Sequence, residues 1–265
     1  MRTVLNGVLV VAGGVILSIL GLLLVRKLWP ALALSDSNEI GDDFITVLGT
    51  AYGVLVAFVV STVWGRFTDA ERESDTEANE IFTLLHLTDL ISAPNGRVFH
   101  DHLIDYTHSL LEDEWALLAR GRGSMRTQDS LQRLWATFRD ISSGGRETDV
   151  VLTQALQRLE GLTDSRRLRL FNSDDSVPTI LWVLLLVEGV ITVVFTYLLV
   201  APNLIIQLLM TAALAATIGT SLYLIAALNH PFAGIPRVTE QNLRGVLRDW
   251  ETQIETSSHR ATGAP

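Results

Sequence analysis

The sequence predicts an all-α integral membrane protein with four transmembrane helices, two before and two after a cytoplasmic helical bundle. The chain of 265 residues is 48% hydrophobic and only 18% charged, whereas ordinary soluble domains are about 25% charged. Its mean hydropathy is +0.33. Four long apolar stretches contain one charged residue between them, Glu188. Each stretch has the roughly 20 residues that a helix needs to cross a bilayer.

The four stretches define two predicted hairpins. Helices at about 4–25 and 44–64 form the first transmembrane hairpin, within residues 1–64. Helices at about 177–200 and 204–228 form the second, within residues 177–228. Only three residues separate the last two helices, so we expect them to be antiparallel neighbours.

Residues 65–176 predict a cytoplasmic helical domain. The apolar stripe of the second stretch continues at helical spacing to about Ile91. Gly- and Ser-containing breaks near 92–96, 121–124 and 142–145 then delimit three more helices, near 97–120, 131–141 and 151–162. An acidic series lacks the glycine turn of a calcium loop and is expected to be a solvated face. It comprises Asp69, Glu71, Glu73, Asp75, Glu77 and Glu80.

Residues 229–265 predict a cytoplasmic C-terminal segment. A turn containing Pro231 and Gly234 follows the last apolar stretch. An amphipathic helix is expected over 238–254, followed by a disordered tail from about Thr256.

The distribution of basic residues predicts the orientation. All but two of the 20 Lys and Arg residues lie on the side that holds both termini and residues 65–176; the exceptions are Arg26 and Lys27. The positive-inside rule places that side in the cytoplasm. Lys27 is the only lysine, a usage typical of GC-rich bacterial genomes. We therefore expect a multi-pass protein of the bacterial cytoplasmic membrane, with the lipid bilayer as a partner and both termini cytoplasmic.

Composition and motifs exclude several functions. The net charge of −9 and the lack of a basic block argue against a nucleic-acid partner. The chain has no cysteine, and therefore no thiolate nucleophile or disulfide. We find no nucleophile elbow, phosphate loop or zinc-protease helix. The expectation is a protein that is not an enzyme and has no cofactor.

One face of the second stretch is a candidate pore lining. It carries small and hydroxyl residues at helical spacing: Thr46, Thr50, Gly53, Ala57 and Ser61. Small residues allow helices to pack closely, whereas hydroxyls on an oligomeric pore axis can replace the hydration shell of an ion. Both interpretations remain open.

Glu188 is the second candidate for the ion pathway. An ionisable group inside a spanning helix costs about 2.5–3.5 kcal/mol on insertion scales unless it faces protein or water. It could serve as a pore or proton-relay carboxylate. Alternatively, it could be protonated and bonded to Thr192 one turn later or to a polar group on another helix.

A weaker hypothesis concerns the His- and Asp-rich run that begins at His100. Asp101, Asp105, His108 and Glu112 share one helical face, and imidazole with carboxylate suits zinc or manganese. Such stripes are more often the solvated face of an amphipathic helix, so no metal is expected.

Several motifs resemble the bacterial bestrophin-like family, a domain of unknown function, over about residues 44–246. They are Arg66 to Glu71, Glu77 to Asn79, Glu114 to Gly121, Pro178 to Trp182, and His230 to Gly234. The resemblance extends in layout to bestrophins, whose Asn-Pro-Phe-Gly stretch has counterparts in Asn229, Pro231, Phe232 and Gly234. Ile235 to Val238 stand where bestrophins have an acidic calcium clasp.

The resemblance implies an oligomeric ion channel, pentameric by analogy with bestrophins, which conduct anions. The predicted outer loop, however, carries Asp36, Glu39, Asp42 and Asp43 against two basic residues, which would attract cations. Inorganic ions are thus expected partners, with their sign open. The alternative is a membrane-anchored signalling or scaffold protein that acts through its cytoplasmic helices.

Overall fold

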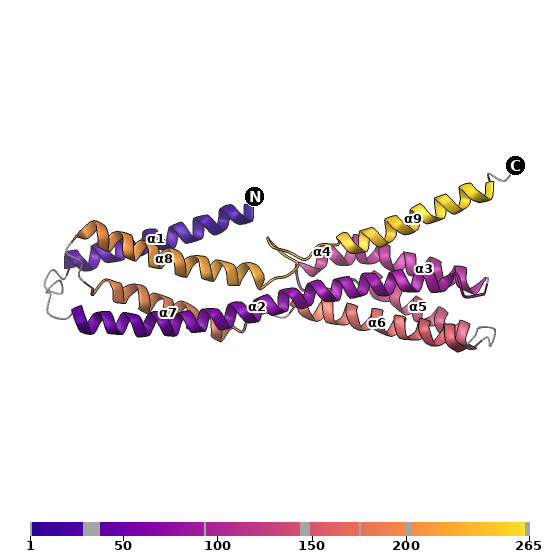
Figure 1. The fold of residues 1–265 in the computed structure, drawn as a ribbon, viewed down its shortest axis with the longest axis horizontal. Coiled ribbons are helices and arrows are strands. Elements are labelled where there is room, and N and C mark those ends of the chain that lie inside the picture. The colour runs from indigo at the N-terminus through magenta and orange to yellow at the C-terminus, as the bar shows by residue number, and fades with distance from the viewer. Residues whose placement is uncertain are drawn as a thin grey trace. The chain divides into compact units, whose positions relative to one another are not determined.

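The computed structural model describes residues 2–28, 38–92, 94–143, 149–174, 176–199 and 203–262. All regular elements within these ranges are helices, as predicted (Figure 1). They are α1 (Arg2–Leu28), α2 (Asn38–Thr88), α3 (Asn95–Ser109), the π-helical turn η3 (Leu110–Glu114), α4 (Trp115–Leu118), α5 (Met125–Ser143), α6 (Asp149–Asp174), α7 (Thr179–Thr196), α8 (Leu204–Leu228) and α9 (Gln241–Thr262).

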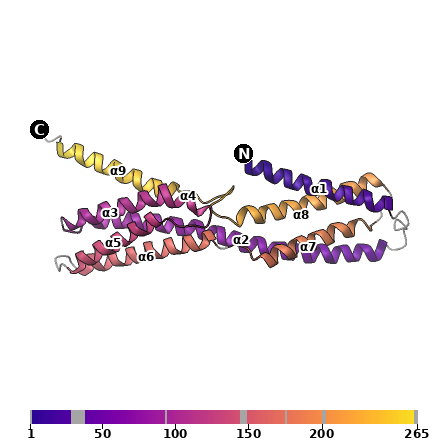
Figure 2. The same ribbon diagram turned by 180° about the vertical axis from the view of Figure 1, so that it is seen from behind.

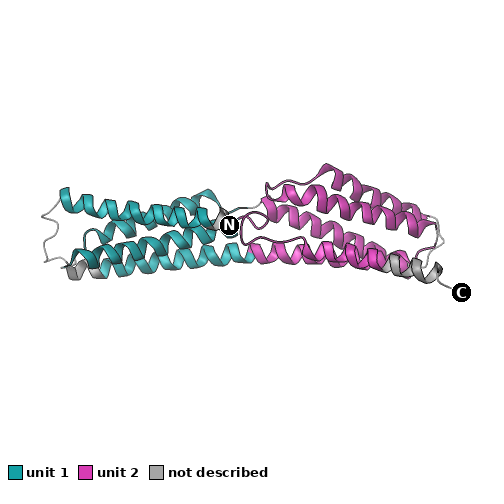
Figure 3. Cartoon of the chain, turned by 90° about the horizontal axis from the view of Figure 1, so that it is seen from above, with its two compact units in different colours: residues 1–65, 176–229 teal, residues 66–175, 230–265 magenta. Residues whose placement is uncertain are grey.

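The chain divides into two compact units (Figure 3). Unit 1 comprises residues 1–65 and 176–229, and unit 2 comprises residues 66–175 and 230–265. Four helices of the described chain are long and apolar enough to cross a membrane. The prediction of an all-α protein with four apolar helices is therefore confirmed.

Within unit 1, α1 packs chiefly against α8 and, less extensively, against α7. Figures 1 and 2 show α1 and α8 side by side from opposite directions. A glycine allows this approach, because a Cβ on Gly7 would lie 2.4 Å from the Tyr223 ring of α8. Gly21 does the same beside the end of α7, where its Cβ would lie 2.8 Å from the Tyr197 hydroxyl. The main partner of the first apolar helix is thus the fourth, not its neighbour in the chain.

Unit 2 is a helical bundle with its own apolar core. The core residues come from α2, α3, η3, α5, α6 and α9 and include Ile81, Leu85, Phe99, Leu103, Leu134, Leu159 and Leu247. Three of them, on α9, are Leu243, Leu247 and Trp250. The C-terminal helix is therefore part of the bundle.

Several element boundaries differ from the prediction, among them the following three. The helix expected over 97–120 consists of α3, η3 and α4, with a π-helical turn in the middle. α7 ends at Thr196, although the apolar run continues. α9 begins at Gln241 and extends to Thr262, past Thr256, where a disordered tail was expected. The π-helical turn and the later end of α9 were not predicted because the predicted helices were placed from the spacing of apolar residues. Helical hydrogen bonding does not depend on that spacing.

Candidate functional site

The predicted pore face of α2 is open in the protomer. Thr46, Thr50, Gly53, Ala57 and Ser61 are all exposed, and at about 100° per residue they occupy one sector of about 80°. A second sector is buried against the rest of the chain through Tyr52, Val59 and Val63. A third exposes large apolar side chains, namely Phe44, Val47, Val54 and Phe58. The part of α2 in unit 1 therefore has three chemically distinct faces.

The open face is smooth and weakly polar. A Cβ added to Gly49 or Gly53 would meet nothing within 4 Å. The Thr50 hydroxyl donates to the Thr46 carbonyl over 2.7 Å, a bond within the helix that leaves the hydroxyl oxygen free to accept another. This face can accept a neighbouring helix or a partly dehydrated ion without any movement of the backbone.

Glu188 lies on α7 and is half-buried. The Thr192 hydroxyl donates to the Glu188 backbone carbonyl over 2.7 Å, so the predicted bond from the carboxyl group to Thr192 is not formed. The carboxylate Oε2 is buried without a hydrogen-bond partner among the described residues, and so is the Tyr52 hydroxyl of α2. A Cβ on Gly189, the next residue of α7, would lie 3.5 Å from the hydroxyl of Tyr52, which belongs to the buried sector of α2. The structure thus associates Glu188 with that sector and not with the open face.

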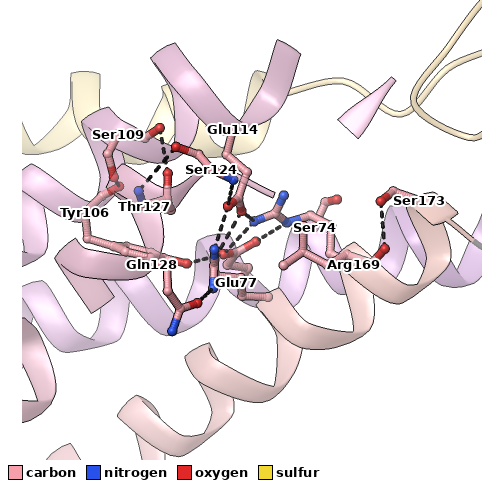
Figure 4. Close-up of polar contacts among 12 residues, drawn as sticks. Ser74, Glu77, Tyr106, Ser109, Glu114, Ser124, Thr127, Gln128, Arg169 and Ser173 are labelled. Atoms are coloured by element: carbon pink, nitrogen blue, oxygen red, sulfur yellow. Dashed lines mark hydrogen bonds and ion pairs between the residues drawn. The ribbon is translucent and has the colours of Figure 1, made fainter. Parts of the chain in front are cut away.

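Unit 2 contains a buried network of charged residues that we did not predict (Figure 4). Arg169 of α6 is fully buried, as are Glu77 of α2 and Glu114 of η3. Arg169 Nε and Nη2 lie 2.6 and 3.2 Å from the two Glu77 oxygens, and Nη2 lies 2.9 Å from Glu114 Oε1. Arg166 Nη2 contacts Glu114 Oε2 at 2.6 Å. Two carboxylates and two guanidinium groups therefore balance each other in the interior.

Neutral groups add to this network, in which Arg169 Nη1 is buried without a hydrogen-bond partner among the described residues. The Tyr106 hydroxyl donates to Glu77 Oε1 over 2.5 Å, and the Ser124 amide donates to Glu114 Oε2 over 2.9 Å. Burial raises the pKa of Tyr106, and the neighbouring Glu77 raises it further, so the phenol keeps its proton. Burial alone would also raise the pKa of Glu114, but Arg169 and Arg166 lower it below its ordinary value. The two arginines therefore favour the ionised form of Glu114.

The prediction of a solvated acidic face is wrong for Glu77. This residue stands seven positions after Ala70 and four before Ile81, so it lies on the same face of α2 as these two buried residues. This spacing could have identified Glu77 as a buried residue. The regular occurrence of acidic residues in this stretch concealed it, because Asp69, Glu71 and Asp75 lie on the other faces of the helix and are exposed.

The turn after α8 connects to this network through aromatic rings. Asn229 accepts a 2.7 Å hydrogen bond from the Val177 amide, and Pro231 accepts one from the Val238 amide. Gly234 adopts a φ of 80°, which favours glycine. Phe232 is buried and packs edge-on against Trp115 at 5.8 Å, and Arg169 lies 5.7 Å from the same indole ring.

The weak metal candidates do not form a site. No three His, Asp or Glu side chains of the described residues are placed to hold a metal ion together. Asp101 pairs with His100, Asp105 with Arg133, and His108 with Glu112, which also lies near Arg126. These residues instead form a surface of ordinary ion pairs and histidine–carboxylate contacts.

The fold and its four apolar helices define a helical membrane protein. The chain matches the Bestrophin-like domain over residues 12–243, and it belongs to the bestrophin-like family. The family resemblance inferred from the sequence is therefore confirmed. No curated protein matches the chain.

Solved structures share this fold. One crystal structure of a bacterial bestrophin homologue from Klebsiella pneumoniae, a point mutant, is 15% identical with a TM-score of 0.70, covering 96% of this chain and 99% of the other. A second crystal structure from the same organism is 14% identical with a TM-score of 0.71, covering 91% and 96%. A third, described as a membrane protein, is 14% identical with a TM-score of 0.73, covering 92% and 97%.

Proposed function

We propose that this protein is an oligomeric ion channel of the bacterial cytoplasmic membrane, in which several copies present the open face of α2 to a shared pore. One observation carries the proposal. A membrane-spanning helix exposes a continuous face of hydroxyl and small side chains that nothing in its own described chain covers. Membership of the bestrophin-like family supports it.

Lipid is a poor match for this face. The lipid-compatible surfaces of unit 1 carry large apolar side chains, such as Leu17 on α1, Ile180 on α7 and Leu209 on α8. The open face of α2 offers hydroxyls and backbone in the same part of the molecule. Such a surface is satisfied by a close helix neighbour or by water and ions. A ring of copies around a pore gives this face both a close helix neighbour and contact with water and ions.

The other parts of the proposal follow from charge distribution and analogy. The basic residues favour cytoplasmic termini and a cytoplasmic unit 2. Bestrophins suggest five subunits. We take the protein to act by conduction and not by catalysis, without a cofactor, and with ions and lipid as partners. The hydroxyl face is neutral, so it accommodates an ion of either sign.

Reconstitution tests the channel directly. Subunit number is measured by light scattering in mild detergent, and flux is measured in liposomes under separate anion and cation gradients. Thr50→Leu and Ser61→Leu should reduce flux by about tenfold or more, because each adds an apolar branch to the narrow face. Val54→Leu, on the large apolar sector, is the matched control and should leave flux unchanged. A monomer without flux would contradict the proposal.

One observation favours the scaffold alternative. Unit 2 exposes the large apolar side chains of Phe82, Leu90 and Val98 outside its core, and such surfaces can bind partner proteins. This alternative predicts a protein that conducts no ions but retains a cytoplasmic partner after mild solubilisation. The flux measurement above distinguishes the two functions.

A further inference from the structure

Over residues 241–252, the part whose side chains are described, the C-terminal helix α9 contacts unit 2 through an apolar face and a few polar groups. Leu243, Leu247 and Trp250 are buried in the core of the bundle. At the start of the helix, Asn242 donates to Asp75 over 2.6 Å. Farther along, Trp250 Nε1 lies 2.7 Å from His100 Nε2 of α3. The bond from Trp250 to His100 is thus a polar contact beside the buried apolar face.

The direction of this hydrogen bond fixes the state of the histidine. An indole nitrogen only donates, so His100 Nε2 must accept and must carry a lone pair. His100 Nδ1 lies 3.2 Å from Asp101 Oδ1, which only accepts when ionised. The proton of the neutral ring is therefore on Nδ1. A second proton would have to go to Nε2, the atom that binds Trp250.

Protonation and the docked position of Trp250 therefore compete for one atom. The contact between the two rings does not offset the loss of this hydrogen bond. Trp250 directs its N–H edge at the imidazole, and the edge of an aromatic ring is its positive part. The two ring centroids lie 5.3 Å apart at an angle of 38°. An imidazolium here would face an N–H group with which it cannot bond.

Charged residues lie near the His100 imidazole on α3 and on α9. Asp101 is next to His100 on α3 and stays beside it whether α9 is docked or released. Asp89, in the turn after α2, and Arg97 of α3 line an open cavity of about 390 Å³ together with His100, Asp101 and Trp250. The ionisable residues of α9 around Trp250 are exposed, namely Arg248, Asp249 and Glu251. The cavity gives solvent protons access to the imidazole.

A second histidine beside Trp250 behaves differently. The His86 ring of α2 lies 5.6 Å from the Trp250 ring, edge to face. Its Nδ1 lies 2.9 Å from the Phe82 carbonyl, to which it can only donate. Protonation of His86 leaves that bond intact. His86 is therefore a natural control for His100.

We propose that His100 is a pH-sensitive latch that holds α9 on the bundle when its imidazole is neutral and releases α9 when it is protonated. The sign follows from the competition at Nε2. The hydrogen bond to Trp250 contributes to docking while His100 Nε2 carries no proton. It is lost when acid places a proton on that atom. The inference rests on unit 2 alone and does not depend on ion conduction.

Distance measurements on the full-length protein test the latch. The natural chain has no cysteine, so spin labels can be attached specifically after Thr252→Cys on α9 and Ser142→Cys on α5, two exposed positions. Distance distributions between the labels are recorded from pH 8 to pH 5 in detergent or nanodiscs. A parallel series includes Leu247→Ala, which removes buried contacts of α9 and brings a released population into the measurable range.

We expect the released fraction, relative to the docked fraction, to rise by about two- to tenfold at low pH, as loss of one hydrogen bond implies. His100→Gln keeps an acceptor that cannot be protonated in this range, and should abolish the pH dependence while α9 stays docked. His86→Gln should leave the dependence unchanged. Trp250→Phe should increase release at pH 8 and flatten the profile.

Three outcomes would overturn the latch. One is a released fraction that does not change with pH even with Leu247→Ala. The second is a pH dependence that persists in His100→Gln, and the third is a pH dependence that disappears in His86→Gln. Because the readout is the position of α9, a protein that conducts no ions can still show the latch, and a channel can lack it.

Discussion

Arg169 shows how a single buried charge organises unit 2. Its guanidinium bonds two carboxylates and lies near the Trp115 ring, so three separate parts of the chain must come together to satisfy it. Uncompensated charges in a protein interior are strongly destabilising, whereas a fully paired set is tolerated. The network therefore penalises incorrect arrangements of α2, η3 and α6.

Removing one member of the network should destabilise the protein. Glu77→Gln leaves Arg169 without one of its two counter-charges and should lower the free energy of unfolding by about 3–5 kcal/mol. Glu71→Gln, on an exposed position of the same helix, should change it by at most about 0.5 kcal/mol. Denaturant unfolding of the solubilised protein measures both. Equal effects of the two substitutions would contradict the role assigned to Glu77.

The same network predicts a dependence on acid. The pKa of Glu114 is lower in the folded protein than its ordinary value of 4.5, so its ionised form stabilises the fold above about pH 4.5. That contribution is lost as the pH falls through the lowered pKa. Glu114→Gln should be less stable at neutral pH and should lose less stability between pH 5 and pH 3. Thermal unfolding across this range measures the difference, and parallel profiles would argue against it.

Among the helices, α2 combines tasks that usually belong to different elements. Its first half presents an open small-residue face in unit 1, and its second half contributes Glu77 and Ile81 to the interior of unit 2. It is followed by α3, whose first turn contains Gly96. A Cβ on Gly96 would lie 2.6 Å from the Thr88 carbonyl oxygen and 2.7 Å from that of Ile91. Both obstacles are backbone atoms, which cannot rotate away.

Substitution of this glycine should disturb the connection between α2 and α3. Gly96→Ala should cost about 1–3 kcal/mol because the backbone must shift to relieve the overlap. Gly245→Ala in α9 is the matched control, since its Cβ would meet nothing within 4 Å. There the loss of glycine flexibility should leave stability unchanged or raise it by up to about 1 kcal/mol. Melting temperatures of the two variants decide between these outcomes.

The whole molecule consists of an apolar unit and a charged unit joined by continuous chain. The apolar unit is made of helices whose exposed surface suits a bilayer. The other unit has a core and buried polar groups like those of a soluble domain. This division agrees with the distribution of basic residues, which is a signal for topology and not for fold.

Labelling from outside the cell tests the proposed topology. In the cysteine-free chain, Ser35→Cys in the predicted outer loop should react with an impermeant maleimide in intact cells. Ser143→Cys, on an exposed position of α5, should react only after the membrane is opened, because unit 2 is expected in the cytoplasm. The reverse pattern would refute the orientation. Labelling at both positions in intact cells would do so as well.

Local patterns predicted much of this fold but little of its interior chemistry. The apolar stretches, the breaks between helices and the family resemblance all depend on residues close together in the sequence. The open face of α2 was also recognised as a set, because helical periodicity alone places Thr46 to Ser61 together. The partner of each charged residue could not be predicted, since Glu77 and Arg169 meet only after α2 and α6 have packed.

The sequence by itself determined the helical class, the four apolar spans and the family, because each depends on composition and spacing along one helix. Only the tertiary structure decided that α1 packs on α8, that Glu77 is buried with Arg169, and that Trp250 donates to His100. These contacts join residues that are far apart in the chain. Their energies depend on how completely the packed helices exclude water from each pair, and that exclusion is a property of the assembled bundle.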